Sequence, residues 1–311
     1  MNLSKSYIIM FIFVIFVFLF TGSINAELEG SLDLKRIKGY TQYEIGGSYY
    51  GFSSLLEFPL NHNFIGGKLK SDILNSNFQY KISGFTNITK KFGKMKDSDW
   101  IYNFGAEGKD IYSESDAYLN RSYIFDFELS YIMKLNKNFT IIAKSGYKKQ
   151  KLDYTIKDGV QYGSITETGE YISKENKFIL EGELLEYKVN YKMPYLGIQF
   201  YHDNNNYDFK YGFNISPYVK ATDEDDHLLR NKISYSKTQG RAYILNAKVD
   251  YKIFNNLKFK TEFDYLSIKT SGTQNQYFYD DVRNTKEFIT SVSNDIESKQ
   301  SNITLGFIYN F

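Results

Sequence analysis

Residues Tyr243–Ile253, YILNAKVDYKI, decide the fold of this 311-residue chain. Every second residue from Tyr243 to Ile253 is apolar, and most of the residues between them are polar. An alternation of period two predicts a β-strand with one apolar and one polar face. The stretches 207–215 and 303–311 repeat the pattern. The sequence therefore predicts an all-β protein.

Short asparagine-rich segments separate these alternating stretches. They lie at residues 75–77, 136–138, 204–206 and 255–256. Asn tolerates turn conformations, so each segment predicts a tight hairpin turn. Longer polar stretches, which predict loops, lie near residues 45–50, 89–118, 158–175, 223–231 and 271–298. Four short turns and five long loops together predict ten strands.

The N-terminus has the features of a targeting segment. Lys5 precedes a 13-residue apolar run, residues 8–20, and small residues follow as far as Ala26. The run is too short to span a membrane as a helix and is typical of a secretory signal peptide. We therefore predict a signal peptide over residues 1–26 and a single outer-membrane β-barrel domain over residues 27–311.

Composition narrows the class of protein. Aromatic residues make up 18% of the chain, with 29 Tyr, and they favour strands and membrane interfaces. The absence of Cys excludes a disulfide scaffold and a Cys-ligated zinc site, and a net charge of +2 gives no general attraction to nucleic acid. Short turns at one end and long loops at the other predict a ten-stranded antiparallel transmembrane β-barrel, with periplasmic turns and extracellular loops. A soluble sandwich or lipocalin-like barrel is the alternative.

Two polar clusters could carry chemistry at the long-loop end. Asp97 and Asp99 share one face of an extended segment, and two close carboxylates can share a proton or hold a water. Asp225 lies two residues from His227, and a carboxylate that orients an imidazole creates a general base. A polar loop or a calcium site would explain the Asp97–Asp99 cluster alone, and a solvated acidic loop would explain the Asp225–His227 cluster. Both could also meet across the barrel mouth.

Several segments resemble the omptin family of outer-membrane aspartate/histidine proteases. Residues 93–100, GKMKDSDW, resemble the family's paired-aspartate segment, and residues 223–227, DEDDH, resemble its Asp-His segment. Residues 187–197 resemble a family strand between the two. The likeness covers most of the mature chain in order and approximate spacing.

The resemblance implies an endopeptidase site in a groove at the rim of the barrel. Asp97 and Asp99 would face Asp225 and His227, with a water between the pairs that attacks the scissile carbonyl. His227 would take the proton of this water, and Asp225 would orient the ring. The resemblance implies neither a metal ion nor a cofactor, and the division of work between Asp97 and Asp99 stays open.

The family prefers substrates with basic residues near the cleaved bond. Asp223 matches an acid of the pocket for the residue before the bond. Tyr43 aligns with the second acid of this pocket, and Glu44 beside it is the candidate replacement. Glu114 and Asp110 are the candidates for the residue after the bond. The predicted partners are thus peptide or protein substrates.

The resemblance also implies dependence on lipopolysaccharide bound to the outer barrel wall. Tyr147 matches one family contact, and Lys151 stands where an Arg is expected. Lys keeps the charge but loses the bidentate fork for phosphate. The predicted location is the outer membrane of a Gram-negative bacterium, with the active site outside. Outer-membrane lipid is a predicted partner, and nucleic acid is not. We expect a monomer, because a closed barrel has no free edge.

One pattern conflicts with an unbroken strand. The odd residues of 207–219 are mostly apolar and should face lipid, yet Asp223, Asp225 and His227 are odd as well. Strict alternation would point these three side chains outward. The sequence therefore predicts a β-bulge between Val219 and Asp223.

Two other functions stay open at this point. The first is a catalytically silent surface barrel that acts as an adhesin or binding protein through its loops. The second is a small pore, which a lumen filled by charged side chains would oppose. The predicted lumen residues are Lys248, Asp250, Lys258 and Glu262.

Overall fold

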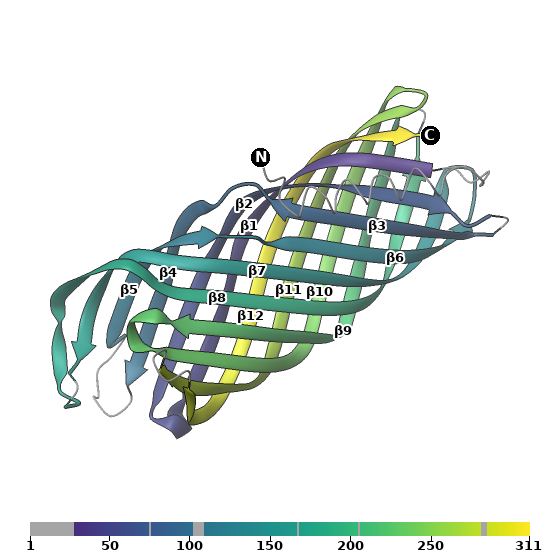
Figure 1. Ribbon diagram of the computed structural model, residues 1–311. Helices are drawn as coiled ribbons and strands as arrows, with labels where there is room; N and C mark the ends of the chain where they lie inside the picture. Colours follow the sequence, from purple (N-terminus) through teal and green to yellow (C-terminus); the bar gives the residue numbers. More distant parts are fainter. Residues whose placement is uncertain (1–27, 75, 102–108, 167, 205, 281–284) are drawn as a thin grey trace.

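The computed structural model describes residues 28–311 apart from 75, 102–108, 167, 205 and 281–284 (Figure 1). The predicted signal peptide, residues 1–26, lies outside the described residues. Among the described residues, no helix is long and apolar enough to cross a membrane.

Almost all of the described chain is β-strand. Two short 3-10 helices, η2 (Ser48–Tyr50) and η4 (Leu228–Arg230), are the exceptions among the assigned elements. The strands are β1 (Leu28–Gly47), β2 (Phe52–Asp72), β3 (Phe78–Asn87), β4 (Lys91–Ile101), β5 (Ile111–Leu119), β6 (Tyr123–Lys134), β7 (Phe139–Ile165), β8 (Tyr171–Asp203), β9 (Tyr207–His227), β10 (Lys232–Phe254), β11 (Leu257–Asp280) and β12 (Thr285–Asn310).

The strands form one antiparallel sheet that closes on itself. β1 pairs with β2 on one side and with β12 on the other, which closes the ring. β3 and β4 both pair with β2, each with a different part of its length. In the same way, β5 and β6 pair with different parts of β7. The twelve described strands therefore occupy ten positions in the wall. The predicted antiparallel barrel is confirmed, and two of its ten strands are each interrupted.

The two interruptions lie next to each other, and the side chain of Asn87 forms hydrogen bonds at both of them. The Asn87 amide nitrogen donates to the Leu119 carbonyl at 3.0 Å, and the Ser122 backbone N–H donates to the Asn87 amide oxygen at 2.9 Å. Asn87 thus supplies hydrogen bonds that the broken strand ladders lack. The breaks fall near the limits of the stretch 89–118 that was predicted as one loop, whereas most of that stretch forms β4 and β5.

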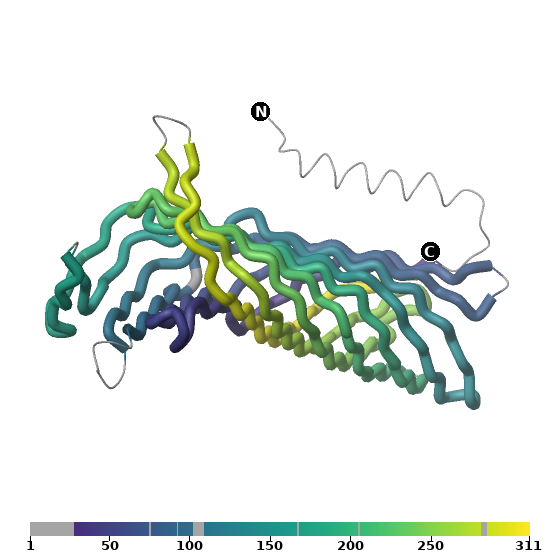
Figure 2. Tube along the Cα trace, turned by 90° about the horizontal axis from the view of Figure 1, so that it is seen from below, coloured from purple at the N-terminus to yellow at the C-terminus, as the bar shows by residue number. Residues whose placement is uncertain are grey.

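All four asparagine-rich segments connect neighbouring strands at one end of the barrel, as predicted. Much of what the sequence predicted as long loops continues as strand at the other end. In Figure 2 the β7–β8 and β11–β12 hairpins extend beyond the rest of the barrel there. These stretches are polar on both faces, so alternation could not reveal them, but pairing with neighbours still satisfies their backbone groups.

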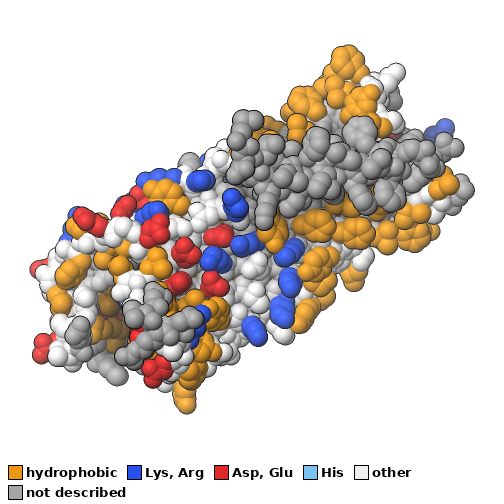
Figure 3. Space-filling view, viewed as in Figure 1, with side chains coloured by type: hydrophobic (Ala, Val, Ile, Leu, Met, Phe, Trp, Pro, Cys, Tyr) orange, Lys and Arg blue, Asp and Glu red, His pale blue; other side chains and the backbone are white. Residues whose placement is uncertain are grey.

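The outer wall carries an apolar belt next to the short turns. In Figure 3 hydrophobic side chains gather over this part, lysines lie along its border, and acidic side chains gather beyond them. Members of the belt include Phe125, Phe127, Tyr211, Phe213, Tyr243, Leu245, Ile303, Leu305 and Phe307, each at least 40% exposed. Such a belt is typical of a barrel that faces lipid.

A layer of aromatic and aliphatic side chains fills the middle of the barrel. The rings of Phe58 and Tyr187 stack with centroids 4.2 Å apart, and Tyr43 and Tyr154 pack around them. All four side chains are fully buried. This aromatic layer separates the mouth, at the long-hairpin end, from the charged lower lumen, at the short-turn end. The arrangement opposes the small-pore alternative.

Candidate functional site

The mouth brings β4 and β9 face to face across the barrel. β5, β7 and β8 lie between these strands in the wall. Asp97 pairs with Leu56 in the ladder, and Leu56 is buried inside the barrel. Because paired residues share a face, Asp97 and Asp99 point into the mouth, as their spacing predicted.

An irregularity in β9 turns its acidic residues inward. The ladder with β10 shifts between Ser216 and Val219, where Pro217 and Tyr218 stand opposite a single residue. Pro lacks an N–H and cannot continue the ladder, so a bulge forms there. The predicted bulge exists, but it lies before Val219 and not after it. Val219 is fully buried inside and does not face lipid, which corrects the predicted face of this residue.

Asp225 and His227 form a close pair at the end of β9. Asp225 Oδ2 lies 2.8 Å from His227 Nε2. The Tyr43 hydroxyl donates to the same carboxylate oxygen at 2.5 Å. Asp225 is 1% exposed, whereas 16% of the His227 side chain remains accessible from the mouth. Asp225 therefore holds one side of the imidazole, and another side of the ring remains accessible from the mouth.

The surroundings of Asp225 keep it ionised. Burial alone would raise the pKa of this carboxyl. The charge of His227 and the hydrogen bonds from His227 and Tyr43 outweigh burial, so the pKa lies below its ordinary value. Asp225 can therefore hold and orient an imidazolium.

The Asp97–Asp99 pair behaves in the opposite way. Burial and the neighbouring Asp99 charge raise the pKa of Asp97 well above its usual range, and Arg230 only partly offsets this. Burial also raises the pKa of Asp99, against a hydrogen bond from Ser54 and the charge of Arg230. The buried Asp97 Oδ1 has no hydrogen-bond partner within the described protein. The raised pKa values of both carboxyls favour a proton held by the pair, which can be offered to a water or a substrate.

Asp223 faces inward two residues before Asp225. It is 5% exposed, and Tyr187 and Asn294 each donate to its Oδ2 at 3.4 Å. Burial raises the pKa of Asp223 to about 7, although a hydrogen bond from Ser236 opposes the rise. This carboxyl therefore changes charge near neutral pH.

Two predicted substrate residues point away from the mouth. Glu44 follows the inward Tyr43, is exposed on the outer wall and accepts a hydrogen bond from Ser53 at 2.8 Å. Glu114 pairs with the exposed Lys96 and so shares its outer face. Both expectations are corrected, because strand alternation places each side chain on the opposite side of the wall from Asp97.

The two predicted lipid-contact residues lie on the outer wall. Tyr147 is 37% exposed and pairs with Phe127 of the apolar belt and with Pro194. Lys151 lies further along the same face of β7, and its Nζ is 3.0 Å from Asp153. The structure thus separates these side chains from the mouth.

Sequence reasoning missed the groups that support the site. Tyr43 was considered as a substituted pocket residue, not as a donor to Asp225. Lys232 pairs with His227 across the β9–β10 ladder, and burial lowers the pKa of its ammonium. Tyr187 and Asn294 reach Asp223 from distant segments. Tyr187 comes from the neighbouring strand β8 and Asn294 from β12, so their contacts with Asp223 depend on strand register and on barrel closure and not on a local motif.

Comparison with known proteins identifies the family and the fold. Residues 53–311 match the family model described as "Omptin family". The chain is 25% identical over 295 residues to "Protease 7" of Escherichia coli K12, covering 93% of this chain and 90% of the relative. It is 24% identical over 237 residues to "Plasminogen activator" of Yersinia pestis, covering 73% and 71%. The crystal structure of the outer membrane protease OmpT from Escherichia coli superposes with a TM-score of 0.77 at 20% identity, covering 94% of this chain and 100% of that one.

Proposed function

The chain belongs to the omptin family of outer-membrane proteins, and from this premise we propose that it is an endopeptidase of the aspartate/histidine type. It hydrolyses exposed peptides or proteins near basic residues, with its active site on the outside of the cell. The observation that carries the proposal is the Asp225 carboxylate, which holds His227 at 2.8 Å and leaves the imidazole open to the mouth.

The proposed reaction uses a water held between the two pairs. His227 accepts a proton from this water as it attacks the scissile carbonyl. Asp225 stabilises the imidazolium that forms, because its pKa is already lowered by the same partners. The proton shared by Asp97 and Asp99 can donate to the carbonyl oxygen as negative charge develops there. His227 then returns its proton to the leaving amine.

Asp223 is the proposed acid for a basic residue before the cleaved bond. It lies on the inward face beside Asp225, so a substrate side chain that enters the mouth can reach it. Tyr43 and Tyr187 fill the space around it with aromatic surface. We propose that the pocket binds the aliphatic stem of Lys or Arg against these rings and the charge against Asp223.

Lipopolysaccharide is the proposed activator. Tyr147 and Lys151 lie on the outer wall, and Lys149 on the same face of β7 contacts the ring of Tyr123. Lysines in this position could bind lipid phosphates as point charges. Lipid bound there would restrain the wall that leads into the β7–β8 hairpin.

The test is cleavage of a quenched peptide library, rich in paired basic residues, by the refolded mature chain with and without lipopolysaccharide. His227→Ala and Asp99→Asn should each lower kcat/KM by about a thousandfold, since each removes a group that moves or holds a proton. Glu44→Gln and Glu114→Gln are matched controls, because both carboxylates face the outer wall, and each should keep activity within about twofold.

Two results would contradict the proposal. One is the absence of cleavage by a folded wild type supplied with lipid, which would favour the surface-binding alternative. The other is full activity of the His227→Ala variant, which would place the chemistry elsewhere.

A further inference from the structure

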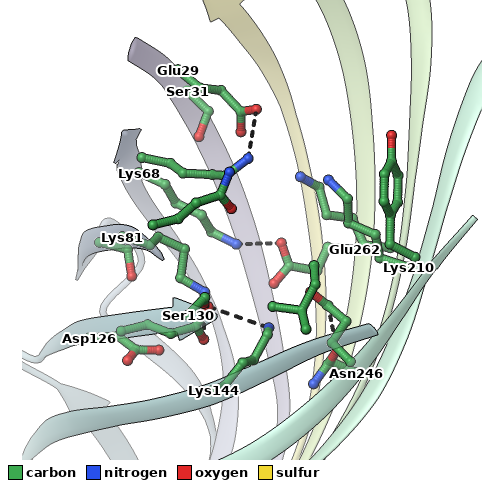
Figure 4. Close-up of a pocket in the computed structure, with 18 of the residues that line it drawn as sticks. Glu29, Ser31, Lys68, Lys81, Asp126, Ser130, Lys144, Lys210, Asn246 and Glu262 are labelled. Atoms are coloured by element: carbon green, nitrogen blue, oxygen red, sulfur yellow. Dashed lines mark hydrogen bonds and ion pairs between the residues drawn. The ribbon is translucent and has the colours of Figure 1, made fainter. Parts of the chain in front are cut away.

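The lower lumen encloses a cavity of about 420 Å³ between the aromatic layer and the short turns (Figure 4). Among the described residues, its lining includes eleven lysines and seven aspartates or glutamates. Asp33 and Asp250 bind lining lysines from just outside the cavity. With these two added, the lysines still outnumber the carboxylates by two. This cavity takes no part in the proposed proteolysis.

The first surplus charge comes from a carboxylate that serves two lysines. Asp250 Oδ2 lies 2.9 Å from Lys248 Nζ and 3.4 Å from Lys210 Nζ. Asp250 itself is 2% exposed, so both lysines share a carboxylate that is buried away from bulk water. One carboxylate balances one ammonium, and the second ammonium remains without a full counter-charge.

The second surplus charge arises in the same way across the lumen. Glu128 lies 3.0 Å from Lys81 Nζ and 3.4 Å from Lys144 Nζ. In Figure 4, Lys144 of β7 and Lys210 of β9 both reach toward the cavity, with only β8 between their strands in the wall. Two positive charges therefore face one enclosed space in which charge is costly unless it is paired.

The cavity extends to the short-turn end of the barrel. Strand-end residues next to the turns belong to its lining, namely Lys70, Asp72, Gln79, Lys134 and Asn310. Apolar side chains further from the turns also line it, namely Phe85, Ile124 and Ile244. A small solute would thus enter from the periplasmic side and meet the surplus lysines before the aromatic layer.

We propose that this cavity binds a small divalent oxyanion, with inorganic phosphate as the representative ligand, between Lys144 and Lys210. A divalent anion matches the excess of two positive charges. Ammonium groups form short, charge-assisted hydrogen bonds to phosphate oxygens, and these bonds are stronger where water is excluded. The bound anion would link β7 to β9, the two neighbours of β8, and so stabilise this part of the barrel.

The test uses the full mature chain with the Asp99→Asn substitution, so that proteolysis cannot interfere. Inorganic phosphate is titrated at constant ionic strength, and binding is followed by calorimetry and by the shift in Tm. We expect saturable binding of one phosphate per chain and a rise in Tm that chloride at equal ionic strength does not reproduce.

Charge-removing and charge-keeping variants locate the site. Lys144→Met with Lys210→Met leaves Glu128 and Asp250 each with one lysine, so the lumen becomes neutral and the affinity for phosphate should fall at least tenfold. Lys144→Arg with Lys210→Arg keeps the charge and should keep the affinity within about threefold. Lys237→Met removes an exposed lysine on the outer face of β10 and should leave the affinity for phosphate unchanged.

Three outcomes would overturn the inference. They are no saturable binding by the wild type, equal affinity in the double Met variant, or a rise in Tm that follows ionic strength whatever the anion. The last result would indicate screening of the lumen lysines instead of a site.

Discussion

The mouth and the lower lumen of this barrel both present carboxylates on the inward face, yet they hold them differently. In the lower lumen Asp33 lies 2.6 Å from Lys260, and Glu128 and Asp250 each contact two lysines. In the mouth Asp97 has Asp99 as its foremost charged neighbour, and both carboxyls keep raised pKa values. Carboxylates paired with cations stabilise a wall, whereas carboxylates paired with each other hold a proton ready to move. The same side chain thus serves structure or chemistry according to its partner.

Breaking a lumen pair should have the largest effect. Asp33→Asn leaves Lys260 buried without its counter-charge, and both side chains are at most 1% exposed. We expect the free energy of unfolding to fall by about 3 kcal/mol, measured by denaturant unfolding from lipid vesicles. The kcat/KM of the folded fraction should stay unchanged. The double variant Asp33→Asn with Lys260→Met should recover most of the loss, and an undiminished loss would show that the pair is not the cause.

Removing a supporting donor in the mouth should change activity more than stability. Tyr43→Phe deletes the hydroxyl that helps to lower the pKa of Asp225. The pKa of Asp225 should therefore rise, and the acid limb of the kcat/KM profile should move to higher pH. We expect kcat/KM to fall about tenfold at neutral pH, the scale of one hydrogen bond to a charged group.

Tyr191→Phe is the matched control for this change. Tyr191 is also fully buried, and its hydroxyl lies 2.6 Å from that of Thr41 instead of contacting Asp225. Its pH profile should match the wild type. If the acid limb moved equally in both variants, general loosening of the aromatic layer would explain the effect better than the Asp225 contact.

The architecture could be predicted from the sequence, because two local signals suffice for it. Alternation such as that of Tyr243–Ile253 marks strands, and the asparagine-rich turns mark their ends. The breaks at residues 88–90 and 120–122 lie near the limits of the predicted loop 89–118, but the strands β4 and β5 between them could not be predicted, and Asn87 joins the breaks through contacts distant in sequence.

The candidate site was less accessible to sequence reasoning. Spacing placed Asp97 and Asp99 on one face, and resemblance proposed Asp225 and His227 as their partners. The faces of Glu44 and Glu114 depend on ladder register, which a motif alignment does not follow. The β9 bulge was predicted from a conflict in parity, but its position depends on Pro217. Odd-numbered residues face lipid early in β9 and face inward late in β9, so the register must shift between the two parts. The shift occurs at Pro217, which has no N–H to continue the ladder.

Removing one carboxylate of the Asp97–Asp99 pair should change how stability depends on pH. Asp97 has a raised pKa, so the native state holds a proton that the unfolded chain releases above about pH 4. Stability should therefore fall as pH rises from about 4 toward 8. Asp97→Asn should flatten this decline and stabilise the barrel by about 1 kcal/mol at pH 8, while lowering kcat. Tm measured across this pH range tests it, and a variant as pH-sensitive as the wild type would contradict it.

The smallest expected effect concerns Asp223, whose surroundings are intermediate between those of the lumen carboxylates and those of the Asp97–Asp99 pair. Tyr187 and Asn294 donate hydrogen bonds to it, and no lysine or arginine of the described residues forms an ion pair with it. Its pKa of about 7 means that its charge develops between pH 6 and 8. The preference for Arg over the isosteric but neutral citrulline before the cleaved bond should rise severalfold over this range. The ratio of the two kcat/KM values isolates this effect, because titration of the catalytic groups changes both substrates equally. Asp223→Asn should give a low ratio that does not depend on pH. A wild-type ratio that stays constant from pH 6 to 8 would mean that another group receives the basic side chain, and the mouth would then recognise its substrate without a titrating acid.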